Sequence, residues 1–386
     1  MSSLGYESCS DRLATLDEWA WGAPSLERSR RAAAMTGALE RVRADLQDAI
    51  AGRIFPAAVA EVGDHRKTIW RESFGSMTFG ETSSAIGDDT IFDLASLTKP
   101  LATTSLLLEL VGDSRLNLTE PVGSSFEEWR GLDRDLVTVQ NLLEHASGLP
   151  ARLADRSAEG RREFEHEICS LPLEYHPRSR SIYSDLGFIL LGFLAEDRDG
   201  RPLDEQFDRI VGQVTQGLGF RPSHELRSRV APTAPEADDR RRGRLLIGEV
   251  HDSYAAALGG VAGHAGLFGT ATGVGEFARA VLRATRGDHS PVAFLSASLA
   301  RLATTRSRVP DSSRALGWDT MLPTSSCGVR MSPAAFGHVG YTGTSLWIDP
   351  VLDRYFVLLA NRACQGGTLE QMRQVRRRFH DAATGL

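Results

Sequence analysis

Lysine is almost absent from this 386-residue chain. Of its 44 lysine and arginine residues, only Lys67 and Lys99 are lysines. Arginine stays protonated in proteins, whereas a desolvated lysine can lose its proton and act as a base. A lysine retained in such a chain therefore indicates a position that arginine cannot fill, unless the scarcity reflects only a genomic bias. Lys67 follows Gly63-Asp64-His65-Arg66, which predicts an ordinary hairpin turn between two strands.

Long apolar runs and a basic excess are also missing. No run approaches the ~18 apolar residues that span a bilayer, and the first 24 residues lack the basic-then-apolar pattern of a signal peptide. We therefore expect a cytoplasmic protein without a membrane span. The 44 basic and 50 acidic residues give a net charge of −6, which argues against a nucleic-acid partner.

Cysteine is scarce and widely spaced. The four cysteines show no metal-ligand spacing, and free thiols fit a reducing compartment. We expect no metal site. The cysteines are Cys9, Cys169, Cys327 and Cys364.

Apolar periodicity predicts strands near both ends of the chain and helices between them. This order predicts an α/β (α+β) fold in which both termini build one antiparallel sheet with flanking helices, and a mostly helical lobe is inserted. The expected strands cover 57–62, 68–74, 335–340, 344–349 and 355–361. The expected helices cover 34–53, 137–145, 161–170, 186–196, 203–218, 272–286 and 367–382.

The same reading predicts the domain organisation. Residues 1–33 carry mixed charge with little periodicity and are expected to form an N-terminal extension. Residues 34–114 and 253–386 would form the sheet domain, and residues 115–252 the helical lobe. The size of the chain suits two lobes or one domain with a large insertion.

Lys99 lies three residues after Ser96, in the segment Phe92–Pro100. On a helix, residues at i and i+3 share one face, so the hydroxyl and the amine would be one turn apart. This is the Ser-x-x-Lys arrangement of serine acyl-transfer enzymes, although the spacing also arises by chance. Pro100 is tolerated only in a first helical turn, which places Ser96 at a helix N-terminus. There the helix dipole would oppose protonation of Lys99 and favour an oxyanion nearby.

Two further segments carry candidate partners for this pair. Tyr183 precedes an expected helix, and a phenol near a cation can shuttle protons, although a tyrosine taken alone is more often a packing residue. Phe336–Thr344 is glycine-rich beside a strand, which permits close approach by a ligand. His338 in it can supply charge or a proton, or can be a hydrogen-bonded structural histidine. The glycine-dense Gly259–Gly269 matches no nucleotide-binding pattern and is expected to wall a cleft.

Together, these motifs resemble the serine β-lactamase and penicillin-recognising family, in its branch of class C β-lactamases, D-amino-acid peptidases and esterases. Ser96-Leu97-Thr98-Lys99 matches the first motif, Tyr183-Ser184-Asp185 the Tyr-x-Asn motif, and His338-Val339-Gly340 the Lys/His-Thr-Gly motif. The segments Leu142–Pro150 and Glu249–Phe268 resemble further family signatures. The resemblance extends over about residues 40 to 380.

The resemblance implies a β-lactamase/transpeptidase-like fold and a set of catalytic roles. Ser96 would form an acyl-enzyme, Lys99 would take its proton, and Tyr183 would relay protons to the leaving group and from water. The backbone amides of Ser96 and Tyr341 would form the oxyanion hole. The resemblance implies no metal and no organic cofactor.

The resemblance also assigns substrate binding to Asp185, His338 and Gly340, and here the chain departs from the family pattern. Asp185 replaces an asparagine that usually contacts a substrate amide. Val339 replaces a threonine that commonly helps bind a substrate carboxylate, and His338 replaces the lysine of class C enzymes. Fewer donors for an anion favour an ester or a D-amino-acid peptide over a β-lactam.

The expected activity is therefore that of a serine hydrolase acting on a small-molecule or peptide substrate. A class C-type β-lactamase is one alternative, and a non-catalytic protein that senses a muropeptide or acyl ligand is another. The cleft walls are expected from three loops, at 75–90, 150–180 and 310–335.

Overall fold

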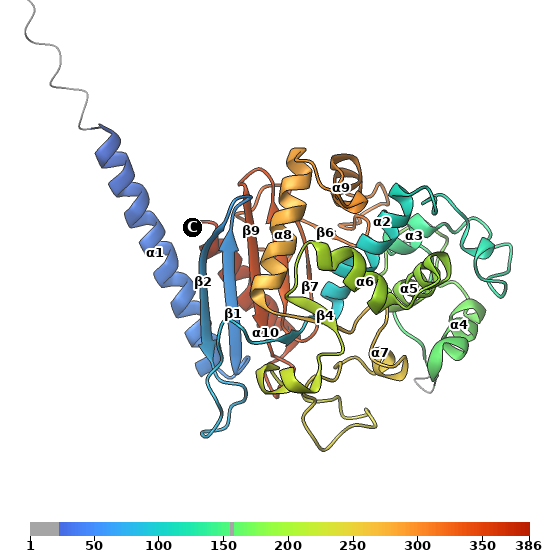
Figure 1. Ribbon diagram of the computed structural model, residues 1–386, viewed down its shortest axis with the longest axis horizontal. Helices are drawn as coiled ribbons and strands as arrows, with labels where there is room; N and C mark the ends of the chain where they lie inside the picture. The colour runs from blue at the N-terminus through green and yellow to red at the C-terminus, as the bar shows by residue number, and fades with distance from the viewer. Residues whose placement is uncertain (1–22, 155–157) are drawn as a thin grey trace, which may run out of the picture.

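The computed structural model describes residues 23–154 and 158–386. Its centre is an antiparallel sheet in the order β2-β1-β9-β8-β7-β6 (Figure 1). The first and last strands in the sequence pair with each other inside the sheet, which confirms the predicted sheet built from both termini. Its strands are β1 (Ala57–Gly63), β2 (Thr68–Gly75), β6 (Asp319–Thr320), β7 (Phe336–Val339), β8 (Ser345–Asp349) and β9 (Arg354–Ala360).

Helices cover both faces of this sheet. α1 (Ala23–Ala51) and α10 (Leu369–Ala383) lie on one face and α8 (Ala271–Arg286) on the other (Figure 1). β1 is buried at every residue, because its alternate side chains pack into two different apolar clusters. A strand buried on both faces reads as a continuous apolar run, which is why this strand was predictable. α1 begins at Ala23, inside the segment that the sequence assigned to an extension.

In its described residues, the predicted lobe at 115–252 contains four α-helices joined by long irregular segments, so fewer of its residues are helical than the sequence predicted. Its 203–218 helix was overextended, because α6 ends at Ile210 and Leu218 already belongs to a strand. The helices outside the sheet layers are α2 (Ser105–Gly112), α3 (Val139–Leu143), α4 (Gly160–Ser170), α5 (Asp185–Asp199), α6 (Leu203–Ile210), α7 (Ser253–Ala257) and α9 (Ala297–Thr304).

A small second sheet, absent from the sequence prediction, connects the two regions. It has the order β3-β5-β4, with β3 (Phe92–Asp93), β4 (Leu218–Phe220) and β5 (Leu267–Gly269). Strands of two or three residues are too short to show a period. The sheet matters because β3 leads directly into the turn that carries Ser96.

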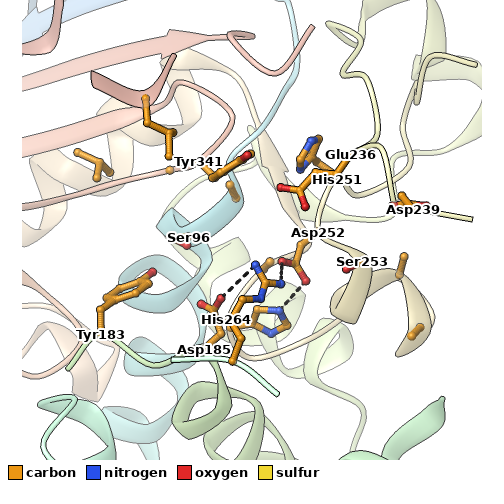
Figure 2. A pocket seen from close by; sticks show the side chains of 18 of the residues that line it. Ser96, Tyr183, Asp185, Glu236, Asp239, His251, Asp252, Ser253, His264 and Tyr341 are labelled. Atoms are coloured by element: carbon orange, nitrogen blue, oxygen red, sulfur yellow. Dashed lines mark hydrogen bonds and ion pairs between the residues drawn. The ribbon is translucent and has the colours of Figure 1, made fainter. Parts of the chain in front are cut away.

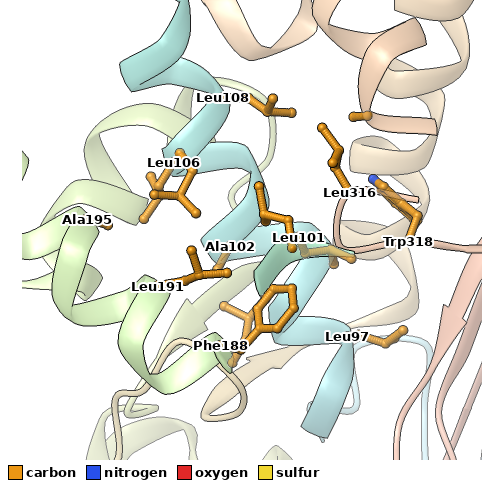
Figure 3. Close-up of a cluster of buried hydrophobic side chains, with 14 of the residues drawn as sticks. Leu97, Leu101, Ala102, Leu106, Leu108, Phe188, Leu191, Ala195, Leu316 and Trp318 are labelled. Atoms are coloured by element: carbon orange, nitrogen blue, oxygen red, sulfur yellow. The ribbon is translucent and has the colours of Figure 1, made fainter. Parts of the chain in front are cut away.

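One apolar cluster extends from the sheet into the helical region. Side chains of the helical segment that follows Ser96, including Leu101 and Leu106, pack against Phe188 and Leu191 of α5 and against Trp318 (Figure 3). Burial of each such side chain contributes about 1.5–3 kcal/mol. The segments after Ser96 and Tyr183 are therefore held rigidly against one another.

Several sequence predictions concern termini and cysteines. In the described part of the chain, no helix is long and apolar enough to cross a membrane. Cys169, Cys327 and Cys364 are buried free thiols. Cys9 and nearly all of the segment examined for a signal peptide lie outside the described residues.

Candidate functional site

The turn that carries Ser96 is held in an unusual backbone conformation. Ala95 has φ of 48°, in the left-handed region that non-glycine residues rarely adopt. The Asp93 carboxylate holds this conformation by accepting the Ala95 amide at 2.8 Å and the His251 amide at 2.6 Å. Non-glycine strain persists only where the surroundings fix it, and it clusters at functional sites.

The helix after Ser96 begins irregularly. Ser96 lies in a 3-10 turn, and a π-helical segment, Lys99–Thr104, precedes α2. The sequence had instead placed Ser96 at the start of a regular helix. π-helical turns are rare and concentrate at functional sites. Lys99 and Ser96 nevertheless share one face, as their spacing predicted.

Lys99 is fully buried, and all its ammonium hydrogens have acceptors. Its Nζ donates to Ser96 Oγ at 3.0 Å, to Asp185 Oδ1 at 2.8 Å and to the His264 carbonyl at 3.1 Å. Burial opposes the charge, but Asp185 and Tyr183 outweigh it, so the pKa of Lys99 is raised above its usual value. The sequence predicted that a helix dipole would favour the neutral amine, and this prediction was wrong. It left out the Asp185 carboxylate, which had been assigned to the substrate but which raises the pKa of Lys99.

Tyr183 and Asp185 are placed by Ser184, the N-cap of α5. The Ser184 amide donates to His145 Nδ1 at 3.1 Å, and its hydroxyl donates to the Pro150 carbonyl at 2.6 Å. The segment Leu142–Pro150, noted in the sequence as a signature, is therefore the support on which this turn rests.

Two cations lie against the ring of Tyr183. Lys99 Nζ is 4.8 Å and Arg314 Cζ is 4.9 Å from its centroid. Positive charge at these distances stabilises negative charge that develops on the phenol during proton transfer. In the described part of the chain, no carboxylate pairs with Arg314, so this guanidinium is available to a ligand.

Two buried histidines lie beside Tyr183. The rings of His145 and His338 lie 4.6 Å and 5.9 Å from that of Tyr183. Burial, and then the cations Arg314 and Lys99, lower the pKa of both imidazoles well below the usual value. The sequence left open whether His338 supplies charge or a proton, or is a structural histidine. With its pKa lowered in this way, His338 supplies no charge to the cleft.

The end of β7 lies directly against the Ser96 turn. A Cβ on Gly340 would lie 2.1 Å from Thr344 Oγ1 and 2.5 Å from the Leu94 carbonyl, so only glycine fits. Thr344 Oγ1 donates to that carbonyl at 3.0 Å. Gly340 therefore lines the cavity and also permits this close approach.

The same approach places Tyr341 beside Ser96. Thr342 Oγ1 donates to the Asp93 carbonyl at 2.7 Å, which fastens the turn after β7 to the turn before Ser96. Among the described residues, no acceptor takes the backbone amide of Tyr341. Figure 2 shows Ser96 with Tyr183 and Tyr341 on either side of it.

Ser96 opens into a cavity of about 620 Å³. Two of the three predicted wall loops line it, through residues such as Arg152 and Arg314, but in the described structure the 75–90 loop contributes none. The sequence prediction missed one wall, the charged segment at 236–241.

A chain of alternating acidic and basic side chains forms one side of the cavity (Figure 2). Arg152 lies 2.7 Å from Asp252 Oδ2 and 3.7 Å from Asp185 Oδ2, and His264 Nε2 lies 2.8 Å from Asp252 Oδ1. Burial opposes ionisation of Asp252, but His264 and Arg152 outweigh it and lower the pKa of this carboxyl well below its usual range. Sequence reasoning missed Arg152 and Arg314, because nothing distinguishes them among 42 arginines (44 minus two lysines).

No cluster of metal-ligating side chains is found in the two described ranges. The groups that meet at Ser96 are a hydroxyl, a buried ammonium, a phenol and an unpaired backbone amide. These are the parts that acyl transfer through a serine requires: a nucleophile, proton-handling groups and a donor for the tetrahedral oxyanion.

Comparison with known proteins gives the same class. The family model described as Beta-lactamase matches residues 42–378, so the chain belongs to this family. A curated Escherichia coli (strain K12) relative, described as "Putative D-alanyl-D-alanine carboxypeptidase", is 31% identical over 310 residues, covering 71% of this chain and 69% of the relative. Membership of this family and this relative indicate a serine hydrolase.

Solved structures show the same fold at low sequence identity. EstCE1, described as a hydrolase with promiscuous acyltransferase activity, superposes with a TM-score of 0.71 at 19% identity and covers 90% of this chain and 99% of its own. A class C β-lactamase superposes with a TM-score of 0.72 at 16% identity and covers 90% and 98%. These likenesses confirm the predicted β-lactamase/transpeptidase-like fold.

Proposed function

We propose that this protein hydrolyses D-amino-acid peptides with a free C-terminal carboxylate through an acyl-Ser96 intermediate. The contact of 3.0 Å between Lys99 Nζ and Ser96 Oγ carries the chemical part of this proposal. Since Asp185 keeps Lys99 protonated, its ammonium stabilises the developing alkoxide. The Tyr183 phenol acts as a relay: its oxygen accepts the serine proton while its own hydroxyl proton passes to the leaving amine. This assigns the base to Tyr183 rather than to Lys99.

The backbone amides of Ser96 and Tyr341 are proposed to bind the tetrahedral oxyanion. The left-handed Ala95 and the close approach of Gly340 support this role, because together they bring both backbone segments to the same point. Loss of one such donor typically costs ~10²–10³ in rate.

Arg314 supports the choice of a carboxylate-bearing substrate. It lines the cavity, lies against Tyr183 and has no acidic partner in the described structure. A guanidinium matches a carboxylate bidentately, and it would replace the donor lost where Val339 stands for threonine. The curated relative described as a carboxypeptidase supports the same substrate class.

An esterase is the second candidate. Val339 offers no hydroxyl to an anionic substrate, and the cavity of about 620 Å³ is large enough for a neutral ester. The family also leaves open β-lactam hydrolysis, and retention of the fold for ligand sensing alone.

Hydrolysis of a matched substrate panel tests these proposals. We would compare an N-acylated D-Ala-D-Ala dipeptide, its C-terminal amide, p-nitrophenyl acetate and nitrocefin, with Ser96→Ala as the control. The proposal predicts that the free-carboxylate dipeptide has the highest kcat/KM and that Ser96→Ala cleaves none. Preference for p-nitrophenyl acetate would select the esterase, preference for nitrocefin the β-lactamase, and no turnover the sensor.

A further inference from the structure

Arg376 of α10 is a buried cation without an anionic partner. Its side chain lines the cavity, and only 5% of the residue is exposed. Burial and the nearby Arg362 lower the pKa of Arg376 to about 9, so the group keeps its charge at neutral pH. In the described ranges no carboxylate pairs with it. A buried charge without a counterion is costly, so a purely structural role would be served better by a neutral donor.

The contacts of Arg376 converge on the turn after β7. Its Nη2 donates to the Gly340 carbonyl at 2.7 Å and to the Thr344 carbonyl at 3.0 Å. The Gly340 carbonyl and the Tyr341 amide belong to the same peptide group. Because a peptide group is planar, fixing the carbonyl also fixes the direction of the N–H.

A charge on the carbonyl has a second effect. A cation that binds the oxygen draws electron density towards it and makes the N–H of the same group a stronger donor, as in a polarised hydrogen-bond chain. The strength of this donor matters most when full negative charge develops opposite it, which occurs in the tetrahedral intermediate.

Arg362 holds the other side of the same residue. Its Nε and Nη2 donate to the Tyr341 carbonyl at 3.2 Å and 2.8 Å, and its Nη1 donates to the Gly367 carbonyl at 3.1 Å. Its guanidinium also lies 4.6 Å from the centre of the Tyr341 ring. Both peptide groups that flank the α-carbon of Tyr341 are thus bound by arginine.

We propose that Arg376 is a positioning residue of the oxyanion hole, whose charge on the Gly340 carbonyl orients and polarises the peptide group that presents the Tyr341 amide to the reacting oxygen. This inference rests on the proposed acyl-Ser96 chemistry. The inference extends that chemistry by assigning a role to a residue that does not touch the reacting atoms and that no sequence motif marks.

Charge-specific rescue tests this proposal. We would measure kcat and KM with p-nitrophenyl acetate, which has no carboxylate, for the wild type, Arg376→Gln and Arg376→Ala. Arg378→Met on the same helix, with a half-exposed side chain paired to Asp45, is the control. Thermal melting would establish that each variant folds, and Arg376→Gln decides if Arg376→Ala does not fold.

The proposal predicts that kcat falls about 10-fold in both Arg376 variants with little change in KM, less than the ~10²–10³ lost with a whole donor. Low concentrations of methylguanidinium should restore Arg376→Ala, whereas urea at equal concentration should not. An unchanged kcat, or equal rescue by urea, would overturn the proposal. A defect confined to the KM of carboxylate substrates would do the same, because it would make Arg376 a substrate ligand.

Fluorophosphonate labelling of the wild type distinguishes a failure of the proposed function from a failure of the inference about Arg376. A wild-type enzyme in which a fluorophosphonate does not label Ser96 would overturn the proposed function and this inference with it. A labelled wild type with fully active Arg376 variants would overturn the inference alone.

Discussion

Lys99 and Asp185, 86 residues apart in the sequence, form a buried ion pair of 2.8 Å at the side of Ser96. This pair decides the resting charge of the site. Without the carboxylate, burial would favour a neutral amine, and with it the pKa of Lys99 is raised. The lysine that the sequence singled out as a base is therefore held as a cation.

Asp185→Asn should move the alkaline limb of the pH–rate profile to lower pH. The substitution removes the carboxylate that raises the pKa of Lys99, so Lys99 would lose its proton, and its stabilising charge, at a lower pH than in the wild type. The measurement is kcat/KM for p-nitrophenyl acetate from neutral to alkaline pH. Asp197→Asn, which removes an exposed partner of Arg161, is the matched control. An alkaline limb that stays in place would contradict the assigned charge.

Arg314→Met should separate substrates by their charge. Loss of the guanidinium would raise the KM for the free-carboxylate dipeptide about 10-fold or more, because a charged hydrogen bond contributes ~1.5–3 kcal/mol. The KM for the C-terminal amide should change little. Equal losses on both substrates would show that Arg314 supports the site as a whole and does not anchor a carboxylate.

Gly340→Ala should reduce acylation while the protein still folds. A Cβ there meets the Thr344 hydroxyl and the Leu94 carbonyl, so β7 must move away from the Ser96 turn. We expect a loss approaching the ~10²–10³ typical of a lost oxyanion donor, measured as the rate of fluorophosphonate labelling. Gly219→Ala is the control, because nothing lies within 4 Å of a Cβ at that position. Wild-type labelling of Gly340→Ala would refute the close approach.

The buried histidines should make the fold sensitive to acid. Burial, and then nearby cations, lower the pKa of His145 and His338 well below the usual value, and that of His380 to about 3. Below pH 6.5 the unfolded state takes up protons that the folded state refuses, so stability falls as the pH drops from 6.5 towards 3. Each histidine contributes up to about 1.4 kcal/mol per pH unit.

Urea unfolding at several pH values measures this slope. His380→Asn should reduce this slope, because it removes one of the buried imidazoles. His380 contacts the buried Ser345 hydroxyl at 2.9 Å and lies outside the cavity lining. The same slope in His380→Asn as in the wild type would show that this histidine is not the source.

Much of the fold was predictable because long buried strands and helices repeat their apolar pattern. β1 and β9 could be recognised from the sequence, and their positions at opposite ends of the chain gave the topology. The short β3 and β5 could not be recognised, because a few residues carry no period, yet β3 positions the Ser96 turn.

For the site, motifs predicted which residues meet but not their charges. Ser96, Lys99 and Tyr183 converge as their motifs indicated, since each motif is local and ends at a helix. The protonation of Lys99 depends on Asp185 and on burial, which arise only in three dimensions. Arg376 was invisible for a similar reason: the role proposed for it depends on its contact with the Gly340 carbonyl, which arises only in three dimensions.

Intact-mass spectrometry tests the central claim most directly. The protein would be exposed to D-Ala-D-Ala peptides, esters, β-lactams and a fluorophosphonate, alongside Ser96→Ala, Lys99→Arg and Lys67→Arg. The account predicts an adduct on Ser96 in the wild type and in Lys67→Arg. Ser96→Ala should form none, and Lys99→Arg should react far more slowly, because a guanidinium does not fit the buried space between Ser96, Asp185 and the His264 carbonyl. A folded wild type that forms no adduct, or an identical adduct on Ser96→Ala, would contradict it.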